Sequence, residues 1–165
     1  MSTHNIALAA AVAMTDGPIL EMGCGHGSTP LLHQMALGMN RLLVSMETDA
    51  DWLAKFQYLE DPLHRLHLVT DWDAEPLERP WGVVLVDHAP GEHRRIAIRR
   101  LQAHADFLVV HDTETDHGTG ADYKLEPVFE SFQYRSDYRR LRPYTTIVSM
   151  TRPFPISECD QSWPG

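Results

Sequence analysis

Three glycines alternate with other residues directly after a short apolar run, in the stretch "ILEMGCGHGSTPLL" at positions 19–32. Gly23, Gly25 and Gly27 predict a turn in which the backbone can pass close to a bound ligand. Several unrelated cofactors bind to such turns, so the surrounding residues have to distinguish between them. Glu21 precedes the turn, and a carboxylate there repels a pyrophosphate and attracts a cation.

Two common phosphate-binding motifs fit this stretch poorly. The dinucleotide motif G-x-G-x-x-G requires a third glycine at position 28, where the chain has Ser28. A P-loop requires a lysine at the end of the glycine turn, but the two lysines of the chain are Lys55 and Lys124. The turn therefore favours a cationic nucleoside over a phosphate.

Further acids and histidines end other apolar runs. Glu47 ends "RLLVSME", Asp87 follows "WGVVLV", and Asp112 follows "FLVVH". A carboxylate at the end of a buried strand is costly to desolvate unless something binds it, so three such ends indicate a site. His88 is the first candidate for a general base, followed by His26 and His111.

Apolar runs and helical patterns alternate along the chain. Strands are predicted at 18–22, 41–47, 63–70, 81–87 and 106–112, and helices at 6–14, 28–37, 48–59, 92–105 and 125–132. Thr3 or Asn5 is expected to cap the first helix and Ser28 or Thr29 the second. Continuous apolar strands that alternate with helices are typical of a parallel sheet covered on both faces. Two last strands, at 132–138 and 144–150, follow each other without a helix and predict an antiparallel hairpin.

The predicted fold class is therefore α/β: one doubly wound, mostly parallel seven-stranded sheet with helices on both faces and a C-terminal antiparallel hairpin. Residues 1–150 are expected to form this single domain, and residues 151–165 a Pro-rich tail. In such a sheet, ligands bind beyond the carboxyl ends of the strands.

The composition narrows the class of partner. The 165 residues include 14 basic and 23 acidic ones, a net charge of −9, which argues against binding to nucleic acids or anionic membranes. The arginine-rich stretches 93–100 and 134–142 are interpreted as a solvated helix face and a hairpin. The longest apolar run, 6–14, is too short for a membrane span, and no signal peptide is expected. Two cysteines, Cys24 and Cys159, make no disulfide framework, so a cytoplasmic location is expected.

The stretch "EMGCGHGS" resembles motif I, E/D-x-G-x-G-x-G, of class I S-adenosylmethionine-dependent methyltransferases, and the expected order of elements matches their seven-stranded core. The resemblance implies S-adenosylmethionine as the cofactor, with the glycine turn under its methionine part and Glu21 near its ammonium group. It also implies that Glu47 accepts hydrogen bonds from the ribose hydroxyls and that Asp71 and Trp72 hold the adenine. The implied cofactor-binding set is Glu21, Gly23, Cys24, Gly25, Gly27, Glu47, Thr48, Asp71, Trp72 and Asp87.

A second resemblance concerns a metal. "VVLVDHAPG" and "FLVVHDTE" are similar to stretches of the catechol-type O-methyltransferases, in which an Asp after the fourth strand and an Asp-Asn pair after the fifth hold Mg²⁺. Asp87 and Asp112 match the two aspartates, whereas Thr113 stands in place of Asn. This implies a divalent metal, Mg, Mn or Fe, on Asp87 and Asp112; histidine ligands would favour Fe, Mn or Zn. The further possible ligands are His88, His111, Glu114, Asp116 and His117. The alternative is that both aspartates only cap helices and loops.

The sequence thus favours a methyltransferase that acts on a small-molecule acceptor, with O-methylation preferred and His88, Asp87 and His111 as catalytic residues. Because the chain has little material to cover an acceptor, a homodimer is one way to complete the site. Two alternatives stay open. One is a domain that binds S-adenosylmethionine or a nucleoside without transferase activity, and the other is a metal-dependent oxygenase resembling the cephalosporin-hydroxylase group.

Overall fold

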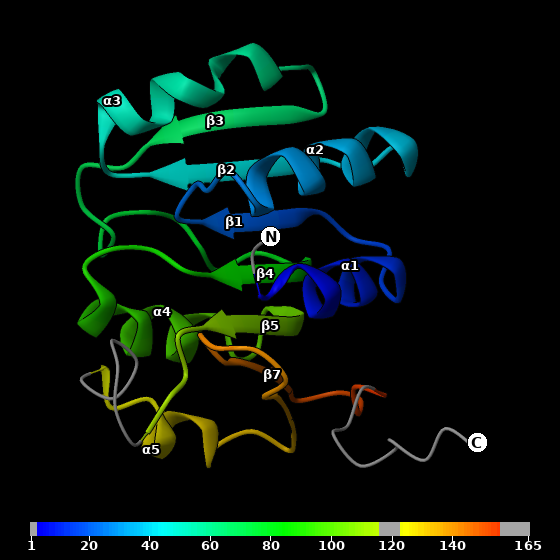
Figure 1. The fold of residues 1–165 in the computed structure, drawn as a ribbon, viewed down its shortest axis with the longest axis vertical. Helices are drawn as coiled ribbons and strands as arrows, with labels where there is room; N and C mark the ends of the chain where they lie inside the picture. The colour runs from blue at the N-terminus through cyan, green and yellow to red at the C-terminus, as the bar shows by residue number, and fades with distance from the viewer. Residues whose placement is uncertain (1–2, 116–122, 156–165) are drawn as a thin grey trace.

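A computed structural model describes residues 3–115 and 123–155 and places a seven-stranded sheet at the centre of the chain (Figure 1). The strand order is β3-β2-β1-β4-β5-β7-β6. β1 to β5 are parallel, β7 is antiparallel to β5, and β6 is antiparallel to β7. The fold class expected from the sequence is confirmed. The strands are β1 (Ile19–Met22), β2 (Leu43–Glu47), β3 (His64–Leu68), β4 (Trp81–Val86), β5 (Ala105–His111), β6 (Tyr134–Tyr138) and β7 (Thr145–Ser149).

The register brings the carboxyl ends of the central strands level with one another. Met22 at the end of β1 pairs with Met46 of β2 and with Val86 of β4. The arrowheads of β1 to β5 accordingly point the same way in Figure 1, so the segments that follow them share one edge. This edge carries most of the residues that the sequence singles out.

The helices follow the predicted order. They are α1 (Asn5–Ala13), α2 (Ser28–Gly38), α3 (Ala50–Leu53), α4 (Arg94–Leu101) and α5 (Glu126–Phe129), with 3₁₀ helices η1 (Ala54–Leu59) and η2 (Gly91–His93). α1 and α2 lie within one residue of their predicted bounds, whereas α3, α4 and α5 are shorter than predicted. The single helix predicted at 48–59 is in fact α3 followed by η1. Phe56 and Leu59 are both buried, and a 3₁₀ helix puts residues three apart on the same face.

The expected side-chain caps of α1 and α2 are wrong. His4 and Gly27 are the N-cap residues, and neither makes a side-chain capping hydrogen bond. The Thr29 hydroxyl instead donates to Glu21, and the Asn5 amide donates to the carbonyl of Gly27. Both polar side chains therefore hold the glycine turn rather than a helix end.

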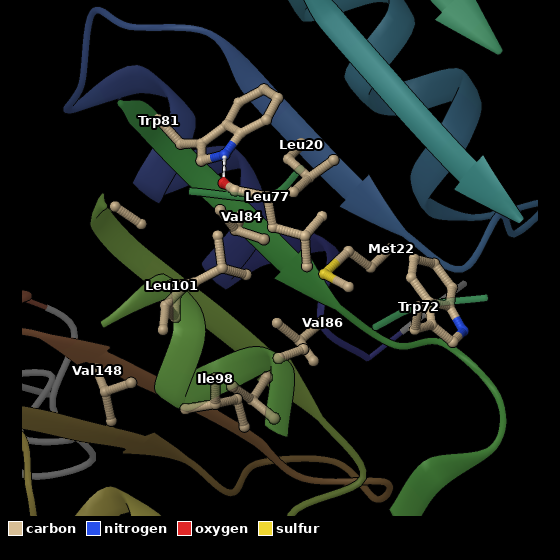
Figure 2. Packing of buried hydrophobic residues seen from close by; sticks show 14 of the residues in the cluster. Leu20, Met22, Trp72, Leu77, Trp81, Val84, Val86, Ile98, Leu101 and Val148 are labelled. Carbon is tan, nitrogen blue, oxygen red and sulfur yellow. Dashed lines mark hydrogen bonds between the residues drawn. The ribbon is translucent and has the colours of Figure 1, made fainter. Parts of the chain in front are cut away.

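Two large apolar clusters cover the two faces of the sheet, and a third, small one joins Cys24 of the glycine turn to Phe56 and Leu59 of η1. Ile19 packs with α1 and α2, which lie over the near face in Figure 1, whereas Leu20 and Met22 pack with α4 and α5. Figure 2 shows the second cluster, in which the indole N–H of Trp81 donates to the carbonyl of Leu77 at 2.9 Å. Segment 71–80 is rich in polar residues, but Trp72 and Leu77 of this segment are buried in the core.

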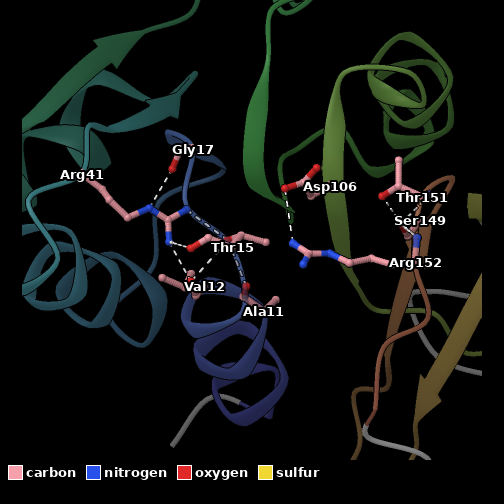
Figure 3. A network of polar contacts seen from close by, with 9 residues as sticks. All are labelled: Ala11, Val12, Thr15, Gly17, Arg41, Asp106, Ser149, Thr151 and Arg152. Atoms are coloured by element: carbon pink, nitrogen blue, oxygen red, sulfur yellow. Dashed lines mark hydrogen bonds and ion pairs between the residues drawn. The ribbon is translucent and has the colours of Figure 1, made fainter.

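The C-terminal residues of the described part also contact the sheet. The Phe154 ring is buried against Phe107, with ring centroids 5.3 Å apart, and Arg152 pairs with Asp106 (Figure 3). Residues 156–165 of the expected tail lie outside the described residues. Within residues 3–115 and 123–155, none of the helices has the length and apolar character that crossing a membrane requires.

Arg41 joins the end of α1 to the start of β1 and β2 (Figure 3). Its guanidinium is buried and donates to the carbonyls of Val12, Thr15 and Gly17 at 2.7–2.9 Å. All three carbonyls lie in the last turn of α1 or beyond its C-terminal end, where a carbonyl has no donor four residues further along a helix.

We expect Arg41→Met to lower the free energy of unfolding by about 3 kcal/mol or more, because several buried carbonyls would lose their donors. Arg41→Lys should recover only part of this loss, since one ammonium cannot reproduce the planar fork. Urea unfolding measures both, with the exposed Arg65→Met as control. Equal stability of the Arg41 and Arg65 variants would contradict this role.

Candidate active site at the carboxyl edge of the sheet

The glycine turn lies against the end of β4. Gly23 has φ +92°, and a Cβ at this position would lie 2.6 Å from the carbonyl oxygen of Asp87. Its amide donates to the carbonyl of Met46 at 2.8 Å, so the turn also contacts β2. The backbone of the neighbouring strands alone therefore requires a glycine at position 23.

Glu21 supports the turn from below. The side chain is fully buried, and its two oxygens accept hydrogen bonds from the hydroxyls of Thr29 (3.0 Å) and Ser45 (2.6 Å). Thr29 in turn accepts the amide N–H of Gly25 at 2.9 Å. Burial raises the pKa of Glu21 to about 7. Its position is thus beneath the glycine turn, and its predicted contact with a ligand ammonium stays a prediction.

A chain of polar side chains continues from Glu21 into the sheet. His64 Nε2 lies 2.9 Å from the Ser45 hydroxyl, and His64 Nδ1 lies 3.1 Å from His33 Nδ1. Because Ser45 donates to Glu21, His64 Nε2 carries the proton towards Ser45, and His33 donates to His64. Burial lowers the pKa of His64 to about 4, which keeps this ring neutral.

Glu47 is held in place at the end of β2 by several donors. One carboxylate oxygen accepts from the amides of Thr48 (2.7 Å) and Asp49 (3.0 Å) and from the Thr48 hydroxyl (3.2 Å). The other oxygen accepts the Cys24 amide of the glycine turn at 3.1 Å. The carboxylate predicted to bind the ribose thus lies directly beside the turn, with its orientation already set.

The predicted adenine residues follow β3 along the chain and differ in their exposure. Asp71 is exposed, and its side chain accepts the amide of Asp73. Trp72 is buried next to Met22 (Figure 2), and its indole N–H donates to the carbonyl of Ala89 at 3.0 Å. The Trp72 ring also contacts the ring of His88, at 4.4 Å between centroids.

Arg94 occupies the space between the two aspartates of the predicted metal site. Its guanidinium pairs with Asp87 at 3.1 Å and with Asp112 at 3.3 Å. It also donates to the backbone carbonyls of Asp87, His88 and His111 at 2.8–3.0 Å. A protein cation therefore already bridges the carboxylates to which the resemblance assigned a divalent metal. The sequence interpretation, which treated 93–100 as a solvated helix face, missed this buried arginine.

The structure brings together two histidines and Asp87. The rings of His4 and His111 are 4.4 Å apart, and one ligand atom from each of His4, Asp87 and His111 lies within 4.8 Å of the other two. Burial lowers the pKa of His4 to about 3 and that of His111 to about 4, and it raises that of Asp87 to about 7. His4 was not a sequence candidate, because nothing in its neighbourhood along the chain indicates a site.

The remaining histidine candidates lie apart from this group. His88 is buried, its pKa is lowered to about 3 by desolvation, and within the described residues neither ring nitrogen has a hydrogen-bond partner. His26 is exposed beside Trp52. The Glu114 carboxylate accepts the amide of Tyr144. Asp116 and His117, named as further possible metal ligands, lie outside the described residues.

The arrangement of elements is that of class I S-adenosylmethionine-dependent methyltransferases, which confirms the fold expected from motif I. Three solved structures with this fold are similar to the chain, each 13% identical in sequence. The S-adenosylhomocysteine-bound methyltransferase PaMTH1 of Podospora anserina has a TM-score of 0.66 over 86% of this chain and 74% of its own. The METTL16 methyltransferase domain has a TM-score of 0.62 over 90% of this chain and 67% of its own.

The third structure is precorrin-6y C5,15-methyltransferase of Geobacter metallireducens, with a TM-score of 0.56 over 88% of this chain and 87% of its own. No family model matches the sequence, and the search of curated proteins found no match. The likeness is therefore one of fold, and the function has to be argued from the site.

Gly23→Ala should lower the free energy of unfolding by about 2 kcal/mol or more, because a side chain at this positive φ would also overlap the backbone of Asp87. Gly25→Ala is the matched control. A Cβ there meets only the Ser28 hydroxyl, at 3.2 Å, so we expect a change below about 1 kcal/mol. Thermal or urea unfolding of both variants measures the difference, and equal losses would refute the close approach.

Glu21→Gln should change how stability depends on pH. The pKa of Glu21 is about 7 in the folded protein against an ordinary 4.5, so the folded state binds the extra proton between these values. The contribution of Glu21 is full below pH 4.5 and decreases as the pH rises through 7.

Relative to Glu21→Gln, the wild type should therefore lose on the order of 1–3 kcal/mol of unfolding free energy between pH 4.5 and 7. Urea unfolding at a series of pH values measures this difference, with the exposed Glu60→Gln as control. A difference that does not change with pH would argue against a protonated Glu21.

Proposed function

We propose that this protein is an S-adenosylmethionine-dependent methyltransferase that acts on a small-molecule acceptor, with oxygen as the favoured acceptor atom. The observation that carries the proposal is the Glu47 carboxylate, which several donors fix at the end of β2 beside the glycine turn. A carboxylate in this place is suited to accept two neighbouring ribose hydroxyls. Its oxygen that faces the Cys24 amide retains acceptor capacity for them.

The charge of the edge supports a cationic ligand. Glu47 and Asp87 lie at the ends of β2 and β4, the strands on either side of β1, and Glu21 lies buried beneath the turn between them. A sulfonium and an ammonium group would be attracted there, whereas a pyrophosphate would be repelled. Gly25 and Gly27 leave the turn without bulky side chains between such a ligand and the backbone.

For methyl transfer, the protein mainly has to orient the acceptor towards the methyl group and remove one proton from the acceptor. The acceptor oxygen bonds to the methyl carbon, the carbon–sulfur bond breaks to leave a thioether, and the hydroxyl proton passes to a base. Among the predicted catalytic residues His88, Asp87 and His111, Asp87 is the most open, with 23% of its side chain exposed, and His111 lies beside it. His88 is fully covered by Trp72 and its surroundings, so we assign the base of the metal-free protein to the Asp87 and His111 pair ahead of His88.

The acceptor, the oligomeric state and the metal are the remaining parts of the proposal. The net charge of −9 supports a small-molecule acceptor rather than a nucleic acid. We further propose a homodimer that completes the cover over the acceptor, which light scattering on the purified protein tests. We do not assign a metal to Asp87 and Asp112, because Arg94 bridges them.

Calorimetry with S-adenosylmethionine and S-adenosylhomocysteine tests the cofactor. We expect both to bind the wild type, and Glu47→Gln to weaken binding at least about tenfold, or about 1.4 kcal/mol, because a carboxamide accepts fewer ribose hydrogen bonds. Glu60→Gln, which removes an exposed carboxylate away from the turn, is the control. Absence of binding to the wild type would end the proposal.

Formation of S-adenosylhomocysteine in the presence of hydroxyl-bearing acceptors then separates an enzyme from a binding domain. Cofactor binding without turnover across a broad acceptor panel would favour the alternative of a nucleoside-binding domain without transferase activity.

A further inference from the structure

Two buried imidazoles and one carboxylate converge where α1, β4 and β5 meet. His4 precedes α1, Asp87 follows β4, and His111 ends β5, and their ligand atoms lie within 4.8 Å of one another. His4 and His111 are 2% and 8% exposed, whereas the Asp87 side chain is 23% exposed. The group therefore has a closed, histidine-lined side and a carboxylate that faces solvent.

The ring of His4 is the least expected part of this group. It is buried, and neither of its nitrogens has a hydrogen-bond partner among the described residues. An unpaired polar group in this position costs about 1–3 kcal/mol, and a native structure compensates such a cost with a bound water, an ion or a functional gain. One of these nitrogens lies within 4.8 Å of a ligand atom of a second imidazole, His111, and of a carboxylate, Asp87, which indicates what the missing partner is.

We propose that His4, Asp87 and His111 bind a divalent transition-metal ion. Imidazole nitrogen and carboxylate oxygen are ligands that suit Zn²⁺, Fe²⁺, Co²⁺ and Ni²⁺, and two histidines with one carboxylate leave open positions for water or a further ligand. Mg²⁺ and Ca²⁺ prefer oxygen ligands and should bind weakly.

The observed separations are compatible with such an ion. Ligand atoms at about 2.0–2.2 Å from a metal lie roughly 3–3.5 Å from one another, so the three side chains need only small rotations to close on an ion. His111 Nδ1 lies 3.3 Å from the Thr145 hydroxyl, which leaves Nε2 for a metal and provides the kind of outer contact that orients a ligating histidine.

The charged neighbours Arg94 and Asp112 restrict where an ion can bind, but they leave ligand atoms available for it. Arg94 pairs with one oxygen of Asp87 and leaves the other available. Asp112 pairs with Arg94, and its second oxygen lies 3.6 Å from His111 Nε2, which offsets the arginine charge. The ion is thus placed on the α1 side of Asp87 rather than between Asp87 and Asp112.

The test is metal binding itself, which does not depend on methyltransferase activity. Zn²⁺ is titrated into untagged, chelator-treated protein by calorimetry, and Co²⁺ is followed by its visible absorption, which reports nitrogen and oxygen ligation. We expect one ion per chain in the wild type and at least about a 100-fold weaker affinity in His4→Phe, which loses one of three ligands. His88→Phe is the matched control, because His88 is equally buried and equally unpartnered but lies outside the group.

Thermal unfolding separates loss of a ligand from loss of the fold. Without metal, His4→Phe should melt no lower than the wild type, since it removes unpaired buried nitrogens. With Zn²⁺, the melting temperature should rise for the wild type and His88→Phe but not for His4→Phe. Should His4→Phe fail to fold, Asp87→Asn replaces it in the same titration. Equal affinity of the ligand variant and the wild type, or no saturable site in the wild type, would overturn the proposal.

Discussion

The guanidinium of Arg94 is the interaction on which the functional edge depends. Parallel strands end with free carbonyls, and acids at those ends repel one another as well as losing solvent. Arg94 compensates both effects at β4 and β5, because it donates to backbone carbonyls of both segments and pairs with Asp87 and Asp112. Its planar, permanently charged fork is suited to this role, which a lysine could not reproduce.

With β4 and β5 joined in this way, the glycine turn has a fixed surface to lie against. The backbone of Asp87 comes so close to Gly23 that no side chain fits between them. On the other side of the turn, the Cys24 amide donates to Glu47. The turn is therefore held from β2 and β4 at once, and Glu21 and Thr29 support it from below. Such a pre-organised backbone loses little further entropy when a ligand binds.

The fold could be predicted from the sequence because its signals are local and repeated. Continuous apolar runs that alternate with helical stretches specify a parallel sheet, and all seven strands occur near the predicted positions along the chain. The caps of α1 and α2 could not be predicted, because Thr29 and Asn5 bond to groups that are distant in the chain, whereas Asp49 caps α3 through a local bond to the amide of Trp52. Trp72 also illustrates the limit, since a polar segment gave no sign that its ring would be buried beside His88.

The site was predictable where one residue follows a strand, and unpredictable where the fold brings distant residues together. Glu47 and Asp87 could be assigned to the edge from their positions at strand ends. Arg94 has the sequence surroundings of an exposed helix, and only the register of β4 and β5 shows that its side chain turns inward. The position of His4 is even harder to predict. Its ring contacts that of His111, more than one hundred positions away in the sequence, only because α1 packs against the sheet.

α1 also explains how the two proposed sites relate to each other. Its first residues contact both, since His4 packs on His111 and Asn5 donates to Gly27 of the glycine turn. Glu47 and Asp87 are separated by the single strand β1, hence by about 10 Å at the usual strand spacing. A nucleoside held by its ribose at Glu47 and lying along the turn would thus extend towards Asp87. An ion on His4, Asp87 and His111 would meet it at the end where an acceptor has to bind. The start of α1 therefore contacts the glycine turn through Asn5 and supplies the metal ligand His4. Occupancy of the cofactor site is thus expected to influence occupancy of the metal site, and the reverse.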